Sequence, residues 1–308
     1  MKLTTLALYL LASLAVLARP YDAISAETPQ LRVEMFQGGF ATVNSFIFSN
    51  GQSIVVMDVQ RKSYEAEKLV DRIRRYKLPV THILITHGHT DHFTGMPVMR
   101  AAFPEASIVV ATEAIKRDIK AYAIYMDSGG ETGAEPALEP ALKPRTPDHP
   151  DGFDYENIIQ VLPEHRLTLA GGGTLELTTD YKPTEADNMT TVYSPELNAL
   201  FLSDLGYNRV HHWQGDDISF QDIANWRDEL MRLKADYADR NPIVYPGHGE
   251  VADMRLFDEM AQYIDDYTRI TRSGVSREEA MRQMTALYPD YAEADFFLKY
   301  SLINHIPD

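Results

Sequence analysis

The sequence contains no cysteine among its 308 residues. This absence excludes disulfide bonds, thiolate metal ligands, a nucleophilic thiol and a lipid anchor on an N-terminal cysteine. Basic residues are also scarce, since 29 Lys and Arg stand against 45 Asp and Glu and leave a net charge of −16. A chain this acidic repels phosphate backbones and anionic lipid, so nucleic acid is not an expected partner.

A long apolar run occurs at the amino terminus, where Met1-Lys2 precedes the stretch from Leu3 to Ala18. Its roughly 14 to 16 apolar residues fall short of the roughly 20 that span a bilayer. Ile24-Ser25-Ala26 then offers a small residue for cleavage. Residues 1–26 are therefore predicted to be a signal peptide, which implies a periplasmic or secreted protein with no stable membrane anchor after cleavage.

Four potential metal ligands occur within six residues directly after the apolar run 80–85, in His87-Gly88-His89-Thr90-Asp91-His92. The whole chain has only ten histidines. His87 and His89 flank a flexible glycine and can meet on one cation, while Asp91 and His92 reach a second one. The alternative is a polar surface loop rich in histidine, but the density of ligands favours a metal site.

The pattern His-x-His-x-Asp-His resembles the signature of the metallo-β-lactamase superfamily. That family continues with an Asp at the end of a strand and a last His after another strand. Asp204 follows the apolar run 200–203, and His248 lies in Pro246-Gly247-His248-Gly249. Asp58, after Ile54-Val55-Val56-Met57, resembles the carboxylate that the family places behind the metal loop. The resemblance covers residues 31 to 250.

Glu185 stands where the family usually has a third histidine, counting back from Pro195-Glu196. A carboxylate oxygen can bind zinc, but it adds negative charge and shifts the ligand set toward iron or manganese. Two alternatives remain open. Either Asp187 binds in its place, or the protein holds a single metal.

The resemblance implies a binuclear site with a metal-bridging hydroxide as the nucleophile. His87, His89 and Glu185 would hold the first metal, Asp91, His92 and His248 the second, and Asp204 would bridge them. Zinc is the expected metal. Asp91 would also orient the water and pass a proton to the leaving group. In lactone-hydrolysing members a tyrosine placed like Tyr207 donates a hydrogen bond to the substrate oxygen, although Tyr207 can equally be an ordinary loop residue.

The pattern of strands and helices agrees with an α/β fold. Asn50-Gly51 between two apolar runs predicts a hairpin, and Ser63 can cap a helix with apolar positions 66, 69, 70 and 73. Strands are expected at 80–86, 108–110, 190–194, 199–203 and 243–245, and helices near 113–123 and after Ser219. The resemblance implies a four-layer αββα sandwich of two mixed β-sheets with outer helices.

Two segments fall outside this pattern. Residues 126–156 carry no sustained period, so we expect a loop insertion that is either a substrate-binding rim or lid or a disordered connection. Residues 251–308 are predicted to form a C-terminal helical extension to the domain 27–250, with helices near 252–272, from Ser276, and at 291–302. This extension would pack on the core, shape the pocket rim, or mediate a homodimer.

The leading hypothesis is an exported metal-dependent hydrolase that cleaves an ester, lactone, thioester or amide bond of a small molecule. A β-lactamase is one version of it. An iron-dependent sulfur dioxygenase of the same fold is an alternative from a different class, because Glu185 makes the site richer in carboxylate. A metal-binding protein without catalytic activity is the third.

Overall fold

A computed structural model describes residues 30–129, 140–215 and 218–307. The predicted signal peptide at 1–26 and the middle of the predicted insertion lie outside these described residues. No helix in the described ranges combines the length and the apolar character that crossing a membrane requires.

The first sheet has six strands in the order β1-β2-β3-β4-β5-β6. The first three strands pair antiparallel, whereas β3 to β6 are parallel to one another, so the sheet is mixed. Its strands are β1 (Arg32–Gln37), β2 (Asn44–Ser49), β3 (Ile54–Met57), β4 (Val80–Leu84), β5 (Ser107–Val110) and β6 (Ile159–Val161). The parallel part places the carboxyl ends of β3 and β4 at one edge, where Asp58 and the histidine-rich loop begin.

The second sheet has five strands in the order β11-β10-β9-β8-β7 and is also mixed, because only β10 and β11 are parallel. Its strands are β7 (Arg166–Thr168), β8 (Thr174–Thr178), β9 (Thr191–Ser194), β10 (Ala199–Asn208) and β11 (Ile243–Gly249). The parallel pair brings the second halves of β10 and β11 together, which sets Tyr207 opposite His248.

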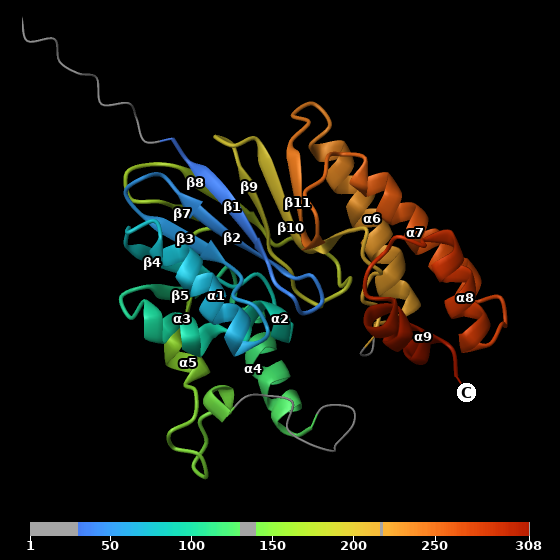
Figure 1. Cartoon of the computed structure of the whole chain (residues 1–308), viewed down its shortest axis with the longest axis horizontal. Coiled ribbons are helices and arrows are strands. Elements are labelled where there is room, and N and C mark those ends of the chain that lie inside the picture. Colours follow the sequence, from blue (N-terminus) through green and yellow to red (C-terminus); the bar gives the residue numbers. More distant parts are fainter. Residues whose placement is uncertain (1–29, 130–139, 216–217, 308) are drawn as a thin grey trace, which may run out of the picture.

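Helices cover the outer sides of both sheets, as Figure 1 shows. Aromatic rings fill the space between the sheets: Phe201 of β10 packs edge-on against Phe46 and Phe48 of β2, at 5.0 and 4.8 Å between ring centroids. On the first sheet lie α1 (Ser63–Arg74), α2 (Thr90–Phe93), α3 (Met96–Ala102), α4 (Glu113–Asp127) and α5 (Tyr155–Ile158), and on the second α6 (Phe220–Asp236) and α7 (Leu256–Thr271). The predicted sandwich of two mixed sheets with outer helices is confirmed.

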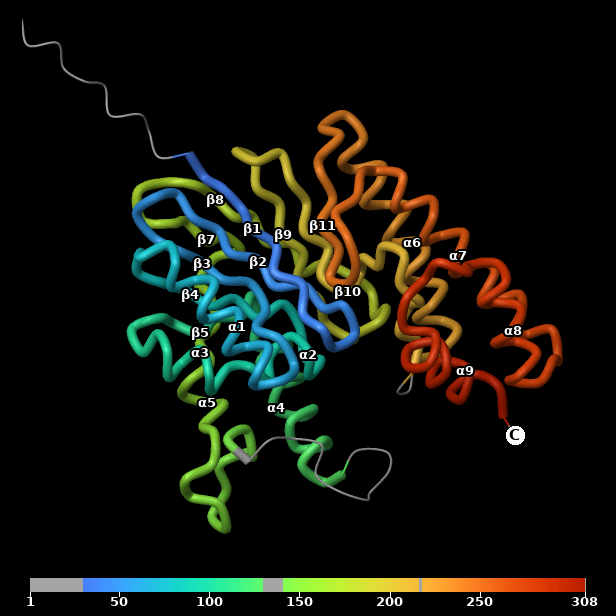
Figure 2. The backbone as a smooth tube through the Cα atoms, viewed as in Figure 1, coloured from blue at the N-terminus to red at the C-terminus, as the bar shows by residue number. Residues whose placement is uncertain are grey.

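The two sheets also meet at their edges, where Figure 2 shows the turn between β1 and β2 beside the ends of β10 and β11. Val43 forms an isolated bridge with His248. The side chain of Asn44 donates hydrogen bonds to the carbonyl oxygens of Pro246 and Gly249, at 3.0 and 2.8 Å. This contact fixes the backbone of the last metal-binding candidate against the first sheet.

Several predicted boundaries need correction. The helix with buried Ala66, Leu69, Val70 and Ile73 is observed, but Lys62 rather than Ser63 occupies the N-cap position. The helix after Ser219 does begin with a capping box to Asp222. Helix α4 extends to Asp127 and α5 begins at Tyr155, so both ends of the expected loop 126–156 are helical.

The C-terminal extension is helical, as predicted, and packs against the second sheet. It contains α7, α8 (Arg277–Leu287), a π-helical turn η3 (Ala294–Leu298) and α9 (Lys299–His305). The helix expected at about 291–302 is observed at 294–305, but its first turn is π-helical. Leu298 donates its backbone N–H to the carbonyl of Glu293, five residues back, which inserts an extra residue into the turn.

Candidate metal centre

The seven predicted metal-binding residues come from four separate segments and converge at one edge of the sandwich. Two groups form, and within each group one ligand atom per residue lies within 4.8 Å of every other. The first cluster is His87, His89, Glu185 and Asp204, and the second cluster is Asp91, His92 and His248. Glu185 therefore joins the site at the position of the expected histidine, whereas Asp187, the alternative, belongs to neither group.

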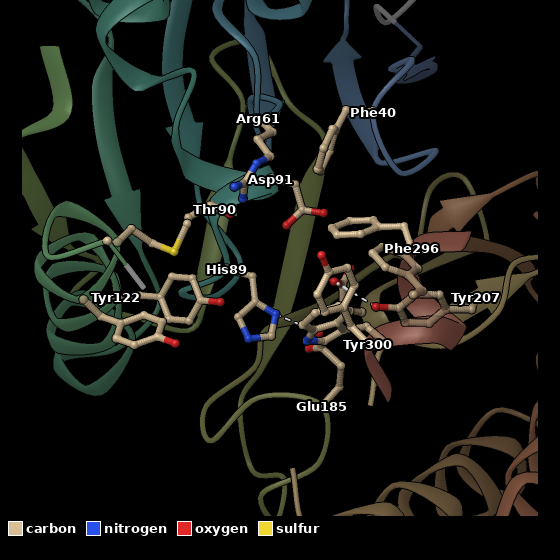
Figure 3. A pocket seen from close by; sticks show the side chains of 16 residues that line it. Phe40, Arg61, His89, Thr90, Asp91, Tyr122, Glu185, Tyr207, Phe296 and Tyr300 are labelled. Carbon is tan, nitrogen blue, oxygen red and sulfur yellow. Dashed lines mark hydrogen bonds and ion pairs between the residues drawn. The ribbon is translucent and has the colours of Figure 1, made fainter. Parts of the chain in front are cut away.

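In the first cluster, Glu185 faces both histidines of the loop. Its Oε1 lies 2.7 Å from His89 Nδ1, and its Oε2 lies 3.9 Å from His87 Nε2. Figure 3 shows His89 and Glu185 pointing toward each other, with a dashed line for their contact. Both carboxylate oxygens of Glu185 are buried.

Asp204 connects the two clusters. Its Oδ1 lies 3.1 Å from His92 Nε2, and its Oδ2 lies 3.2 Å from His248 Nε2 and 3.6 Å from His87 Nε2. Asp91 completes the second cluster, with one oxygen 3.6 Å from His248 Nε2 and the other 3.9 Å from His92 Nε2. Asp204 thus occupies the position that a bridging carboxylate requires.

The donor atoms fit a pair of divalent cations. His87 Nε2, His92 Nε2, Asp204 Oδ1 and both oxygens of Glu185 are buried and accept or donate no hydrogen bond within the described chain. Buried polar atoms normally form hydrogen bonds, so a set that converges in close contact but without hydrogen bonds of regular geometry points to a shared ligand. Three carboxylates buried this close together also need compensating positive charge.

The outer nitrogens of the ligand rings are held by fixed acceptors. His92 Nδ1 lies 2.8 Å from Asp58 Oδ2, and His248 Nδ1 lies 2.6 Å from the carbonyl oxygen of Ala41. Asp58 is itself held by Thr86, whose backbone N–H donates to Asp58 Oδ1 at 2.9 Å. Contacts of this kind set the ring orientation and the tautomer of a metal-binding histidine. Asp58 thus lies behind the metal loop, as the sequence predicted.

The glycine in the Pro-Gly-His run of β11 is explained by the lack of space around it. A Cβ at Gly247 would lie 2.2 Å from Asp204 Oδ1 and 2.6 Å from the backbone of Ser203. Only glycine therefore allows β11 to approach Asp204 this closely. Ser203 itself has a left-handed φ of 49°, so the backbone is strained next to a candidate ligand.

The buried acidic and histidine side chains of the site shift one another's pKa. Burial raises the pKa of Glu185 to about 7, against the opposing effect of His89. Burial also lowers the pKa of His89, but the carboxylate of Glu185 outweighs it and raises that pKa to about 9. The pKa of Asp204 stays well below its usual range despite burial, because His92, His248 and His87 surround it.

Tyr207 lies inside the site. Its ring stacks on His248 at 4.7 Å, and its hydroxyl donates to Asp204 Oδ2 at 3.3 Å. Burial and the nearby carboxylates raise its pKa well above 10, so it remains a phenol. His211 and His212 are buried against Tyr263 and do not reach the cavity, whereas Trp213 does.

A cavity of about 320 Å³ opens beside both clusters, as Figure 3 shows. Sequence reasoning did not identify most of its wall, because single aromatic residues scattered along a chain give no signal of convergence. The aromatic lining residues are Phe40, Tyr122, Tyr125, Tyr207, Trp213, Phe296, Phe297 and Tyr300. Arg61 lines the cavity as well and is the only Lys or Arg among the described lining residues. The last three aromatics show that the C-terminal extension shapes the pocket.

Comparisons with known proteins agree with this geometry. The chain is 22% identical over 223 residues to a metallo-β-lactamase type 2 from Bacillus cereus, which covers 72% of each protein. The fold is similar to a metallo-β-lactamase from Pontibacter korlensis (TM-score 0.53, 18% identity, 77% of this chain and 99% of that one). It is also similar to the DIM-1 metallo-β-lactamase (TM-score 0.51, 18% identity, 78% and 98%).

The family model of the metallo-β-lactamase superfamily matches residues 58–248. These limits are Asp58 behind the metal loop and His248 at the end of the second cluster, so the match contains every candidate ligand. The C-terminal extension lies beyond it. With most of its length matched and its ligand groups assembled on the expected sandwich, the chain belongs to the metallo-β-lactamase superfamily.

Proposed function

We propose that the protein is a binuclear metal-dependent hydrolase that acts on a small molecule, with zinc as the expected metal. The observation that carries this proposal is the meeting of the two ligand clusters at Asp204, on the wall of an open cavity. A divalent cation bound there lowers the pKa of a coordinated water from about 16 to about 7 and polarises the bond under attack.

The residues of the chain supply positioning and proton transfer. Asp91 lines the cavity and keeps 12% of its side-chain surface exposed, so its carboxylate can accept a proton and return it to a leaving group. Tyr207 carries its proton at neutral pH and also lines the cavity. Its single hydroxyl hydrogen, which is donated to Asp204 Oδ2 in the structure, would turn to a substrate oxygen when a substrate binds.

The ligand set allows an ester, lactone, thioester or amide as the bond that is cleaved. A β-lactam is a candidate because the named relatives are metallo-β-lactamases. At about 20% identity, that name does not select the β-lactam over the other bonds, so the test needs a panel of substrates.

The experiment is elemental analysis of the purified protein, followed by chromogenic ester, lactone, thioester and β-lactam substrates. We expect two metal equivalents per chain and a turnover that is lost on chelation and on His92→Ala. His149→Ala is the matched control, because His149 is exposed and lies outside both clusters. Full activity of His92→Ala, or of the chelated protein, would refute the proposal.

A second candidate is an iron-dependent sulfur dioxygenase of this fold. The observation that favours it is Glu185, which gives the site a third carboxylate in place of an imidazole. One iron per chain together with oxygen consumption would support it. Two zinc ions and turnover in the absence of oxygen would exclude it.

Export is part of the proposal and rests on the sequence of residues 1–26. The full chain is expected in the periplasm or the medium after expression in a bacterial host, with a new amino terminus near residue 27. A variant that lacks residues 2–26 should stay in the cytoplasm. Fractionation and N-terminal sequencing of the two proteins measure this, and an uncleaved, cell-retained full chain would contradict it.

A further inference from the structure

Arg61 gives the cavity one strong positive charge outside the metal clusters. It follows β3 in the sequence and is half-buried, and its guanidinium lies over the ring of Phe40, 5.0 Å from the centroid. Figure 3 shows Arg61, Phe40 and Asp91 on one side of the cavity, across from Glu185 and Tyr300. The guanidinium therefore faces the space next to the second cluster.

The backbone around Arg61 is firmly held. Gln60 is buried and donates from Nε2 to Ser45 Oγ at 2.8 Å and to the carbonyl of Val43 at 3.2 Å. The carbonyl of Arg61 accepts a hydrogen bond from the hydroxyl of Thr94. The backbone of Arg61 is therefore fixed at the edge of the cavity that its side chain lines.

The charge of Arg61 has no carboxylate partner in the described part of the chain. No Asp or Glu oxygen of residues 30–129, 140–215 and 218–307 lies within 4.0 Å of its guanidinium nitrogens. The carboxylates of Glu185, Asp204 and Asp91 instead lie close to the histidine rings of the two clusters. A planar guanidinium that faces a cavity and has no carboxylate partner in the described chain is suited to bind a carboxylate through two parallel hydrogen bonds.

A neighbouring cavity differs from the first one in the charge of the residues that line it. It measures about 380 Å³ and shares His89, Tyr122, Tyr125 and Glu185 with the first one. Its other titratable lining residues are Asp118, Asp187 and Asp222, and no Lys or Arg lines it within the described residues. On a chain with a net charge of −16, an anionic group is therefore favoured at the Arg61 end and opposed at the other.

The wall next to Phe40 is aromatic, and three of its four side chains come from the C-terminal extension. Phe296 packs edge-on against Phe40 at 5.5 Å, and Phe297 packs against the ring of His248 at 5.2 Å. Tyr300 and Trp213 complete this wall. These side chains can cover an apolar group of a ligand while Arg61 holds its charged end.

We infer that the substrate carries a carboxylate, which Arg61 binds, next to an aromatic or other apolar group that packs on the C-terminal wall. That the bound molecule is a substrate rests on the proposed function, but the role of Arg61 can be tested by binding alone. It makes Arg61 a specificity-determining residue.

The test is calorimetric titration of the metal-loaded protein with 3-phenylpropionate and with the neutral 3-phenylpropanamide. We expect the wild-type protein to prefer the carboxylate by about 10–100-fold, and Arg61→Gln to lose that preference. Arg61→Lys keeps the charge without the planar fork and should recover part of it. An unchanged preference in Arg61→Gln overturns the inference, as does wild-type protein without any preference, including one that binds neither probe.

Lys62→Gln is the matched control. Lys62 also lies over the ring of Phe40, at 5.3 Å, and its replacement removes the same charge, but it does not line either cavity. We expect this variant to keep the wild-type preference. Equal losses in the two variants would show a general charge effect and overturn the role of Arg61. Metal content and melting temperature of each variant show whether it is folded.

Turnover separates this inference from the proposed function. In a working hydrolase, the ratio of kcat/KM for 4-nitrophenyl hydrogen succinate to that for 4-nitrophenyl butanoate should fall about 10–100-fold in Arg61→Gln. A protein that binds the carboxylate through Arg61 but hydrolyses no substrate of the panel refutes the hydrolase alone. A hydrolase whose ratio ignores Arg61 refutes the inference alone.

Discussion

The two ligand clusters share Asp204 but are supported differently. In the second cluster, His92 and His248 are fully buried, and each has a fixed acceptor behind its ring, Asp58 and the carbonyl of Ala41. In the first cluster, 17% of the His89 side chain is exposed, and its close polar contact is Glu185, which is itself a candidate ligand. The second cluster is therefore the more rigid one, and we expect it to hold its metal more tightly.

Asp204→Asn should have the largest effect, because this carboxylate faces both clusters. The substitution keeps the size of the side chain and removes its charge. We expect kcat to fall by about a thousandfold or more, since metal-assisted charge stabilisation contributes several kcal/mol. Steady-state kinetics and elemental analysis measure the two losses. Two metal equivalents with wild-type kcat would show that Asp204 does not connect the clusters.

Glu185→Ala should break the first cluster and spare the second. We expect one metal equivalent to remain and kcat/KM to fall about 10–100-fold or more. Glu185→His should restore the second equivalent, because an imidazole is the usual ligand at this position of the family. If Glu185→Ala still binds two equivalents, Glu185 is not a ligand and the comparison of the clusters fails.

Asp58→Asn should loosen the second cluster without removing a ligand. The acceptor of His92 Nδ1 becomes a weaker one, and we expect the metal affinity to fall by about 10–100-fold. Ser203→Ala is the corresponding change behind the first cluster, where Ser203 Oγ lies 3.3 Å from His87 Nδ1. Competition with a chelator should show the smaller loss for Ser203→Ala, and the reverse order would contradict the stated rigidity.

The pH dependence of metal binding tests the first cluster without any substitution. Binding requires neutral His89 and ionised Glu185, and the pKa of His89 is raised to about 9. Affinity at the first cluster should therefore increase up to about tenfold per pH unit between 7 and 9. It should fall more steeply below about 7, where Glu185 also takes up a proton.

Glu185→Gln provides the control for this pH profile. It removes the carboxylate that raises the pKa of His89, so the increase in affinity between pH 7 and 9 should flatten. The measurement is chelator competition at a series of pH values. An identical slope in the two proteins would exclude the pair of His89 and Glu185 as the source of the dependence.

The sequence predicted those parts of the site that depend on short segments. The run from His87 to His92 is local, and Asp204 and His248 follow apolar runs whose ends meet at one sheet edge. Glu185 could be located because its distance from Pro195-Glu196 is fixed by the strand that follows. In each case a few neighbouring residues determine where the side chain must lie.

The pocket wall could not be predicted, because it depends on tertiary packing. Arg61 and Phe40 are separated by two strands, and Phe296 is far from both in sequence. The sequence also did not predict the π-helical turn, because the apolar residues of 294–298 fit an ordinary α-helix equally well. The helical ends of the expected loop 126–156 show how weak periodicity hides short helices.

The π-helical turn η3 sets the direction in which cavity-lining side chains of the C-terminal extension point. An α-helix rotates by about 100° per residue, so removing one residue from 294–298 would restore regular winding and swing the following side chains around the axis by roughly that angle. Removal of a residue before Phe297 would turn this side chain, which lines the cavity and packs on the candidate ligand His248, away from its present position. The winding of one C-terminal helix thus sets the shape of the pocket wall, apart from the segments that carry the candidate ligands.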